Sequence, residues 1–191
     1  MSGLTEVEYR AIPALSGTGV ADLLRSPALY RHKLDNPEPS TPAMVLGTLV
    51  HALVLGTEPS AVVSPYPDFR TKEAREWRDG QTLDVVTTET WERAEAIAAA
   101  VRSHPAARLL LDSPGTAEAT LEWQEGDTPC KGRVDWLVDG TLVVDLKTTR
   151  DIEGFGRAVG TYGYHAQVMH YRRGVIASGE PSDLPRERRG V

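Results

Sequence analysis

Three side chains that could support metal-ion chemistry lie close together in the sequence. Two carboxylates, Asp135 and Asp145, interrupt apolar runs that are typical of β-strands, and Lys147 follows the second carboxylate at a spacing of two. Because side chains alternate along a strand, Asp145 and Lys147 are expected on the same face. Burying two carboxylates is costly unless a positive charge neutralises them. The pattern therefore predicts a divalent cation such as Mg²⁺, which prefers oxygen ligands and keeps part of its water shell for a reacting water and phosphate oxygens.

The register of the two strands decides whether the carboxylates can share a cation. Asp139-Gly140 lies between the two runs and predicts a β-hairpin. With a two-residue loop, Asp135 would oppose Val144 and the two carboxylates would point to opposite faces of the sheet. A three-residue loop at residues 139–141, or an equivalent bulge, would instead pair Asp135 with Asp145. Glycine can supply the positive φ that such a loop needs.

A helix is predicted over residues 42–55, with Pro42 in its first turn and Gly56 as its C-cap. It is apolar nearly all round, so we expect it to be buried. His51 lies inside it, where a core histidine satisfied by a hydrogen bond and a metal ligand are both reasonable explanations. The small residues Gly47 and Thr48 would let the helix approach a sheet edge or DNA closely, and this context favours the metal ligand.

The other elements follow from caps and periodicity. Further helices are expected between Ser16 and Ser26, at residues 28–34, 106–111 and 164–176, between a Thr88 or Thr90 cap and His104, and after an Asp151 cap. Residues 59–83 are charged and are expected to be irregular. Residues 117–123 alternate between apolar and polar side chains, which predicts a half-buried strand. Glu118 lies on its polar face, where a further acidic metal ligand and a solvent-facing side chain are equally good explanations.

The length and the net charge of the chain limit the number of domains and the kinds of partner that can be expected. The 191 residues suit one domain with a substantial core, to which we assign residues 1–177, the N-terminal part being helical. Residues 178–191 contain Gly, Pro and many charges, which predicts a disordered tail. The net charge of −6 weighs against a surface that coats nucleic acid broadly. A nuclease with a carboxylate pocket can still be acidic, because the metal and local arginines supply positive charge.

Cys130 is the single cysteine of the sequence. It excludes an intramolecular disulfide, a four-cysteine iron–sulfur cluster and a zinc ribbon, and it is consistent with a reducing cytoplasm. The start of the chain has no basic-then-apolar signal, and the longest apolar stretch, residues 43–56, is too short to span a bilayer. No membrane partner is therefore expected.

A basic cluster surrounds Trp77 and consists of Arg70, Lys72, Arg75 and Arg78. A solvated loop is the ordinary explanation for such a cluster, and we favour it. Contact with a DNA backbone is the alternative.

Gln167 and Tyr171 lie four residues apart on a predicted helix, about twenty residues after Lys147. The D-x9-D-x-K spacing joined to this Gln-x-x-x-Tyr pattern resembles the RecB-type branch of the PDDEXK nuclease superfamily. Further segments narrow the resemblance: Ser26-Pro27-Ala28-Leu29-Tyr30, Leu46-Gly47-Thr48-Leu49-Val50-His51-Ala52, Phe69-Arg70-Thr71-Lys72, Asp145-Leu146-Lys147-Thr148-Thr149 and Tyr164-His165-Ala166-Gln167. In this order they resemble the exodeoxyribonuclease VIII (RecE) nuclease domain and its phage-encoded relatives over roughly residues 14–177.

The resemblance implies roles for named residues. The implied metal ligands are Asp135, Asp145, His51 and, less securely, Glu118. The implied catalytic residues are Asp135, Asp145, Lys147, Gln167 and Tyr171. Among these, Lys147 would position or activate the attacking water, and Gln167 with Tyr171 would steady the site or the DNA end. Candidate DNA contacts are Arg70, Lys72, Arg133 and Tyr164. With a three-residue loop, Arg133 would stand opposite Lys147.

The resemblance also implies a fold and an activity. The fold is α/β, a restriction-endonuclease-like PDDEXK core with a mixed central sheet flanked by helices. The activity is that of an exonuclease that uses Mg²⁺, or Mn²⁺ in its place, and degrades double-stranded DNA from an end in phage-type or bacterial recombination. Some relatives form rings, and a homo-oligomer and a single-strand annealing recombinase are candidate partners. Relatives continue past the Gln-x-x-x-Tyr helix with at least one more strand and helix, so the C-terminal part of the fold is expected to be truncated or completed by another subunit.

Two other functions compete with this hypothesis. One is a structure-specific or single-strand nuclease of the same superfamily, because the site chemistry is shared and only peripheral elements select the substrate. The other is an inactive remnant that binds DNA or a partner without cutting.

Overall fold

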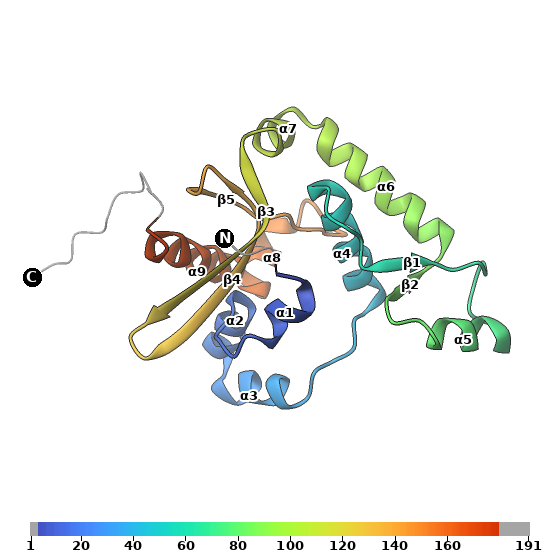
Figure 1. Cartoon of the computed structure of the whole chain (residues 1–191), viewed down its shortest axis with the longest axis horizontal. Helices are drawn as coiled ribbons and strands as arrows, with labels where there is room; N and C mark the ends of the chain where they lie inside the picture. Colours follow the sequence, from blue (N-terminus) through green and yellow to red (C-terminus); the bar gives the residue numbers. More distant parts are fainter. Residues whose placement is uncertain (1–3, 180–191) are drawn as a thin grey trace, which may run out of the picture. The chain divides into compact units, whose positions relative to one another are not determined.

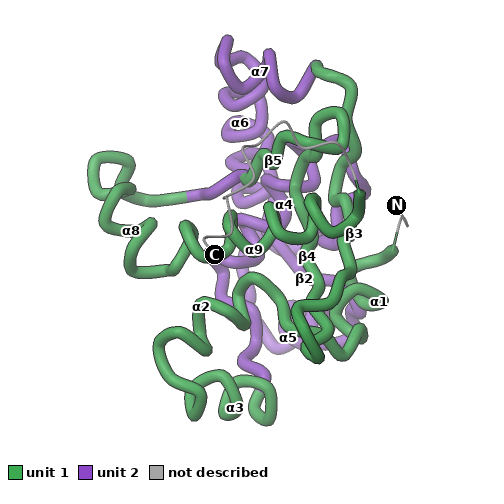
Figure 2. Tube along the Cα trace, turned by 90° about the vertical axis from the view of Figure 1, so that its left-hand side faces the viewer, with its two compact units in different colours: residues 1–36, 113–145, 149–191 green, residues 37–112, 146–148 purple. Residues whose placement is uncertain are grey.

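The computed structural model describes residues 4–179, which fall into two compact units (Figure 2). The first unit holds residues 4–36, 113–145 and 149–179, and the second holds residues 37–112 and 146–148. The elements of the first unit are α1 (Glu6–Ala11), α2 (Gly17–Arg25), α3 (Pro27–Asp35), β3 (Gly115–Glu125), β4 (Thr128–Val138), β5 (Leu142–Val144), α8 (Phe155–Tyr162) and α9 (Tyr164–Ala177). Those of the second are α4 (Pro42–Leu55), β1 (Ala61–Val63), α5 (Lys72–Asp79), β2 (Asp84–Val86), α6 (Thr88–Ser103) and α7 (Pro105–Leu111).

The first unit is built on an antiparallel sheet in the order β3-β4-β5 (Figure 1). Alternate side chains of the long β3–β4 hairpin are buried, because successive residues of a strand point to opposite faces. The buried set from the two strands includes Leu121, Trp123 and Val134, and α9 packs against it through Tyr171 and Val175. The predicted strand at residues 117–123 is thereby confirmed as the middle of β3.

The turn between β4 and β5 has the predicted three-residue loop. Val138 pairs with Leu142 and Trp136 with Val144, so residues 139–141 are left as the loop. Asp139 has φ of +45° and Gly140 has φ of +71°. The Thr141 amide donates to the Val138 carbonyl at 2.9 Å and closes the loop. Asp and Gly are the residue types that accept such backbone angles at low cost, which explains why the turn forms here.

Two glycines allow helices of the first unit to meet closely. Ser16 caps α2 by accepting from the Gly19 amide at 3.1 Å, as predicted. A Cβ on Gly17 would lie 2.9 Å from Cγ of Gln167, so α2 approaches α9 through a residue without a side chain. Gly163 separates α8 from α9 in a left-handed conformation with φ of +69°.

The second unit packs α4 against α6 around a core that includes Leu49, Val50, Val54 and Ala94. The predicted bounds of α4 are confirmed, with Thr41 as its N-cap and Gly56 in the left-handed conformation at its C-cap. The expectation that this helix is buried throughout is wrong for its first half. Met44 is 56% exposed, and the buried residues of the helix begin only at Leu49.

Several local predictions need correction. Residues 59–83 are not irregular: they contain β1, which pairs in parallel with β2, and α5, which Thr71 caps. These elements are too short to show a clear periodicity in the sequence, since β1 has three residues and α5 has eight. Thr87, rather than Thr88 or Thr90, caps α6 by accepting from the Thr90 amide at 3.2 Å. Asp151 does not cap α8, whose N-cap position is Gly154.

The α/β class is confirmed, with the parallel and antiparallel pairings in two separate sheets rather than in one mixed sheet. Among residues 4–179, no helix combines the length and the apolar character that a bilayer crossing requires. The predicted tail lies almost wholly outside the described residues, which end just after α9 at Gly179.

The joint between α8 and α9 gives a paired test of the fold. We expect Gly163→Ala to lower the free energy of unfolding by about 1–3 kcal/mol, because an L side chain is unfavourable at positive φ. The new Cβ would also lie 2.8 Å from Cβ of Ala21. Gly160→Ala is the matched control inside α8, where no atom lies within 4 Å of an added Cβ. Helix propensity predicts a gain of up to about 1 kcal/mol there. Chemical denaturation measures both, and equal effects of the two substitutions would contradict the described joint.

Candidate functional site

The β4–β5 register places the two predicted carboxylates opposite one another. Trp136 faces Val144 in the last pair of the ladder. Continuing this register by one residue on each strand would set Asp135 opposite Asp145, which directly follows β5. Both residues are half-buried. Because directly opposite residues of an antiparallel pair share a face, the backbone provides the arrangement that a shared cation needs.

Tyr171 and Gln167 of α9 belong to the same neighbourhood. Gln167 Nε2 donates to the Tyr171 hydroxyl at 2.8 Å. Tyr171 is 6% exposed, and its burial raises the pKa of the phenol above the ordinary value. The negative charges of Asp145 and, more weakly, of Asp135 raise this pKa further. The phenol therefore stays protonated and able to donate, within electrostatic reach of both carboxylates.

Two glycines that the sequence analysis missed make room for the Tyr171 ring. A Cβ on Gly132 of β4 would lie 2.9 Å from Cδ1 of Tyr171, and one on Gly17 of α2 would lie 3.5 Å from Cε1. The sequence does contain a signal, since a glycine inside a strand often marks a close approach of another group. The ring is thus held between a strand and a helix that present only backbone to it.

Tyr164, at the start of α9, also lies near the carboxylates. Its pKa is raised by burial first, then by Tyr162 and by the negative charge of Asp145. Its ring stacks with that of Tyr162, with 5.6 Å between the ring centroids. Its role as a DNA contact stays a prediction.

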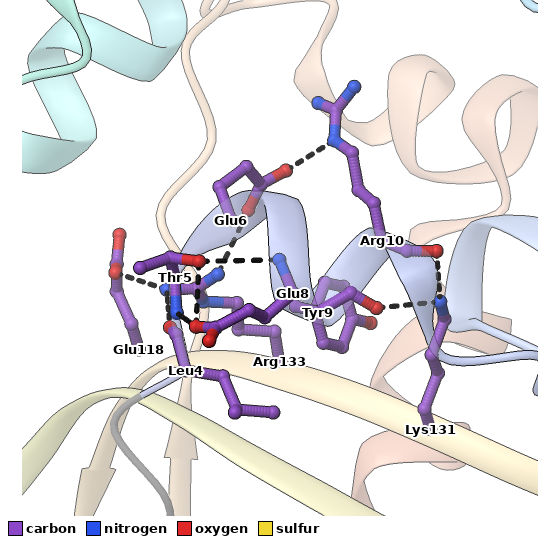
Figure 3. A network of polar contacts seen from close by, with 9 residues as sticks. All are labelled: Leu4, Thr5, Glu6, Glu8, Tyr9, Arg10, Glu118, Lys131 and Arg133. Carbon is purple, nitrogen blue, oxygen red and sulfur yellow. Dashed lines mark hydrogen bonds and ion pairs between the residues drawn. The ribbon is translucent and has the colours of Figure 1, made fainter.

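Glu118 and Arg133 are bound to each other and to the N-terminal helix α1 (Figure 3). The Arg133 guanidinium donates to Glu118 at 2.5 Å, to Glu6 at 3.0 Å and to the Leu4 carbonyl at 3.0 Å. Glu118 adopts a positive φ of +48°, and the β3–β4 ladder skips it between its neighbours Ala117 and Ala119. These internal contacts explain both residues without a metal or DNA, so their predicted roles as metal ligand and DNA contact remain predictions.

Lys131 fastens α1 to β4 and is a structural residue that the sequence analysis missed (Figure 3). Its ammonium donates to the carbonyls of Tyr9, Arg10 and Ile12 at 2.9, 3.2 and 2.8 Å. It also lies 4.8 Å from the centroid of the Tyr9 ring, a distance suited to a cation–π contact. Burial lowers its pKa, a cost that these acceptors offset. By strand alternation, Lys131 and Arg133 share a face of β4 with Asp135, and α1 packs on this face.

His51 and Lys147 both belong to the second unit. His51 is half-buried on α4. Leu146, the residue before Lys147, packs against the core of this unit, and Thr148 Oγ1 lies 3.2 Å from where a Cβ on Gly47 would be. The chain after Asp145 therefore runs beside α4 at a glycine one turn before His51. The roles of His51 as a metal ligand and of Lys147 in catalysis stay predictions.

Two cations of the basic cluster near Trp77, Arg70 and Lys72, are held only loosely. Arg70 lies 3.5 Å from Asp68 and Lys72 lies 3.6 Å from Glu76, with the two cationic side chains 90% and 83% exposed. Exposed ion pairs of this kind contribute little to stability. Both cations therefore keep the exposure that a phosphate contact requires, and that contact stays a prediction.

The donor set of the carboxylate pair suits a hard cation. Within the described ranges, no group of three or more His, Cys, Asp or Glu side chains is arranged to hold a metal ion. A closed zinc site built from such side chains needs four ligands. Mg²⁺ instead is commonly held by one or two carboxylates, with water and substrate phosphate oxygens completing its shell. Asp135 and Asp145 fit this second kind of site.

Comparison with known families gives one match. The family model described as a PDDEXK-like domain of unknown function (DUF3799) matches residues 16–180. The matched range begins at the cap of α2 and contains both carboxylates, Lys147 and all of α9, while α1 precedes it. No curated protein matches the chain.

The buried phenol of Tyr171 gives a test in the alkaline range. Its pKa is raised above the ordinary 10.0 in the folded protein, so above about pH 10 the unfolded chain releases this proton and the folded chain keeps it. The stabilisation is complete below pH 10 and is lost as pH rises, by at most about 1.4 kcal/mol per pH unit. We expect Tyr171→Phe to reduce the fall in unfolding free energy between pH 9 and about 11, measured by urea denaturation. Equal slopes for the parent and the variant would contradict the described burial.

Proposed function

The chain belongs to the DUF3799 family of PDDEXK-like domains, and on this premise we propose that it is a Mg²⁺-dependent deoxyribonuclease that degrades double-stranded DNA from an end. The observation that supports the proposal is the β4–β5 register: its last pair joins Trp136 to Val144, and one further step would set Asp135 opposite Asp145. A fold alone does not imply an activity, because functions reside in sites rather than in folds. Here the site residues, and not only the fold, support hydrolysis of a phosphodiester.

The roles of the residues follow from their chemistry. Asp135 and Asp145 would hold the cation, which when bound supplies a Lewis acid for the phosphate and a water of lowered pKa. Lys147 has no lone pair while protonated, so it cannot be a ligand, and it would orient the attacking water and offset the charge that grows on the phosphate oxygens. Gln167 holds the Tyr171 hydroxyl at 2.8 Å, and the protonated phenol can donate to a DNA or water oxygen.

The finer assignment rests on resemblance. The D-x9-D-x-K spacing followed by Gln167 and Tyr171 supports an exonuclease of the RecE and RecB type acting in recombination. The same resemblance supports three further proposals: a homo-oligomer, a single-strand annealing recombinase as partner, and work on DNA in the cytoplasm. Mn²⁺ is expected to replace Mg²⁺, since both prefer oxygen ligands.

The decisive assay compares linear with closed circular duplex DNA, in Mg²⁺ and in chelator. We expect end-labelled linear duplex to be degraded only in Mg²⁺ and closed circles to persist. Cutting of closed circles would favour a structure-specific endonuclease. Absence of any Mg²⁺-dependent cutting would leave a protein that binds DNA or a partner without cleavage, and would contradict the proposal.

Two variants separate the roles within the site. Asp145→Asn should lose both Mn²⁺ affinity and cleavage, because it removes a charged ligand. Lys147→Ala should keep Mn²⁺ affinity but lose cleavage by ~10²–10³-fold, the usual cost of one preorganised donor. Asp127→Asn is the matched control, since Asp127 is an exposed carboxylate at the β3–β4 turn. A Lys147→Ala protein that cuts at the parental rate would rule out this mechanism.

A further inference from the structure

Three aromatic side chains gather where α8 meets α9. The rings of Phe155 and Tyr164 lie 6.2 Å apart between centroids, and those of Tyr162 and Tyr164 lie 5.6 Å apart at an interplanar angle of 28°. Tyr162 is 63% exposed. Tyrosine usually buries most of its ring, so an exposed ring that already stacks on another is a surface able to accept a further flat group.

The backbone builds this cluster. Phe155 and Tyr162 begin and end α8, and their spacing of seven residues is about two helical turns, which places them on one face. Gly163 then turns the chain with φ of +69°, so that Tyr164 starts α9 beside them. Gly163 also lies where a Cβ would come within 2.8 Å of Ala21. The position of the rings is therefore fixed by the packing of α2 as well as by the turn.

One member of the cluster, Tyr164, lies within electrostatic reach of Asp145, and the helix that it begins packs on the strand before Asp145. α9 packs against β5, and Asp145 directly follows β5. Burial raises the pKa of Tyr164 most, and Tyr162 and the negative charge of Asp145 raise it further. The remaining charge on α8 is that of Arg157, which is exposed and positive. Aromatic rings that have an exposed arginine and a carboxylate of the proposed metal site in their vicinity suit a nucleotide better than an apolar peptide.

We propose that Phe155, Tyr162 and Tyr164 form a stacking platform for one nucleobase of the strand whose phosphate is cut at the Asp135–Asp145 pair. This proposal rests on the proposed nuclease function and deepens it. In a duplex, both faces of an internal base are already stacked on its neighbours, so a base must leave the stack to lie against Tyr162. The platform therefore selects a frayed or single-stranded end. It is tolerant of sequence, because every base has a flat face.

A double-mutant cycle between protein and DNA tests the platform. Binding of a fluorescent single-stranded oligonucleotide is measured in chelator, with an abasic residue moved through the strand one position at a time. We expect Tyr162→Ala to weaken binding of the intact strand about tenfold or more, in the range found for single stacked bases. At one position of the strand, an abasic residue should weaken binding to the parent protein by the same factor. At that position it should not weaken binding to Tyr162→Ala any further, because both changes remove the same contact.

Two control variants separate the loss of the Tyr162 ring from unspecific effects of substitution. Tyr162→Phe should bind like the parent, since stacking needs the ring and not the hydroxyl. Leu24→Ala, which removes a 72% exposed side chain from α2, should also bind like the parent. Additive losses at every abasic position, or equal binding of the parent and Tyr162→Ala, would overturn the platform. Mg²⁺-dependent cleavage is measured separately. Normal cleavage without coupling between Tyr162 and an abasic position would refute the platform alone. Coupling without cleavage would refute the proposed nuclease activity alone.

Discussion

The arrangement of the candidate metal site depends on the three-residue loop between β4 and β5. Side chains along a strand alternate with a period of two, so a loop shorter by one residue would turn Asp145 to the opposite face. The loop is held by positive φ values at Asp139 and Gly140 and by the hydrogen bond from Thr141 to Val138. A turn of ordinary sequence thus determines whether two carboxylates can bind one cation.

The residues around Asp135 and Asp145 are consistent with a pair of carboxylates that share one cation. Two like charges repel each other, and a cation bound between them would offset that repulsion. The buried phenol of Tyr171 adds an uncharged donor beside them, in a slot kept open by Gly17 and Gly132. On the neighbouring stretch of β4, Lys131 and Arg133 hold α1 against the strand. The strand that carries Asp135 is therefore braced by hydrogen bonds and ion pairs to α1 and the residues before it.

The strand register and the Gln167–Tyr171 pairing could be predicted because their signals are local. The spacing of Asp135, Asp145 and the Asp-Gly turn determines the register, and the spacing of Gln167 and Tyr171 determines their hydrogen bond. The bounds of α4 could be predicted for the same reason, since Pro42 and Gly56 mark its ends.

The missed features depend on contacts between residues far apart in the sequence. The bonds from Lys131 to carbonyls near Tyr9 span more than a hundred residues, and no period or motif indicates them. The pairing of β1 with β2 joins two strands of three residues each, too short to show alternation. Glu118, which forms an ion pair with Arg133, also adopts a positive φ that is rare for a glutamate. Such features depend on tertiary packing, which overrides local preference.

The most direct test is whether Asp135 and Asp145 bind the same ion. Mn²⁺ affinity can be measured by calorimetry for the parent, Asp135→Asn, Asp145→Asn and the double variant. If the two carboxylates share one cation, each single change should weaken binding by at least about tenfold, and the double change should cost clearly less than the sum of the two. Losses that add in full, or an affinity unchanged in either single variant, would show that the carboxylates act independently and would contradict the shared site.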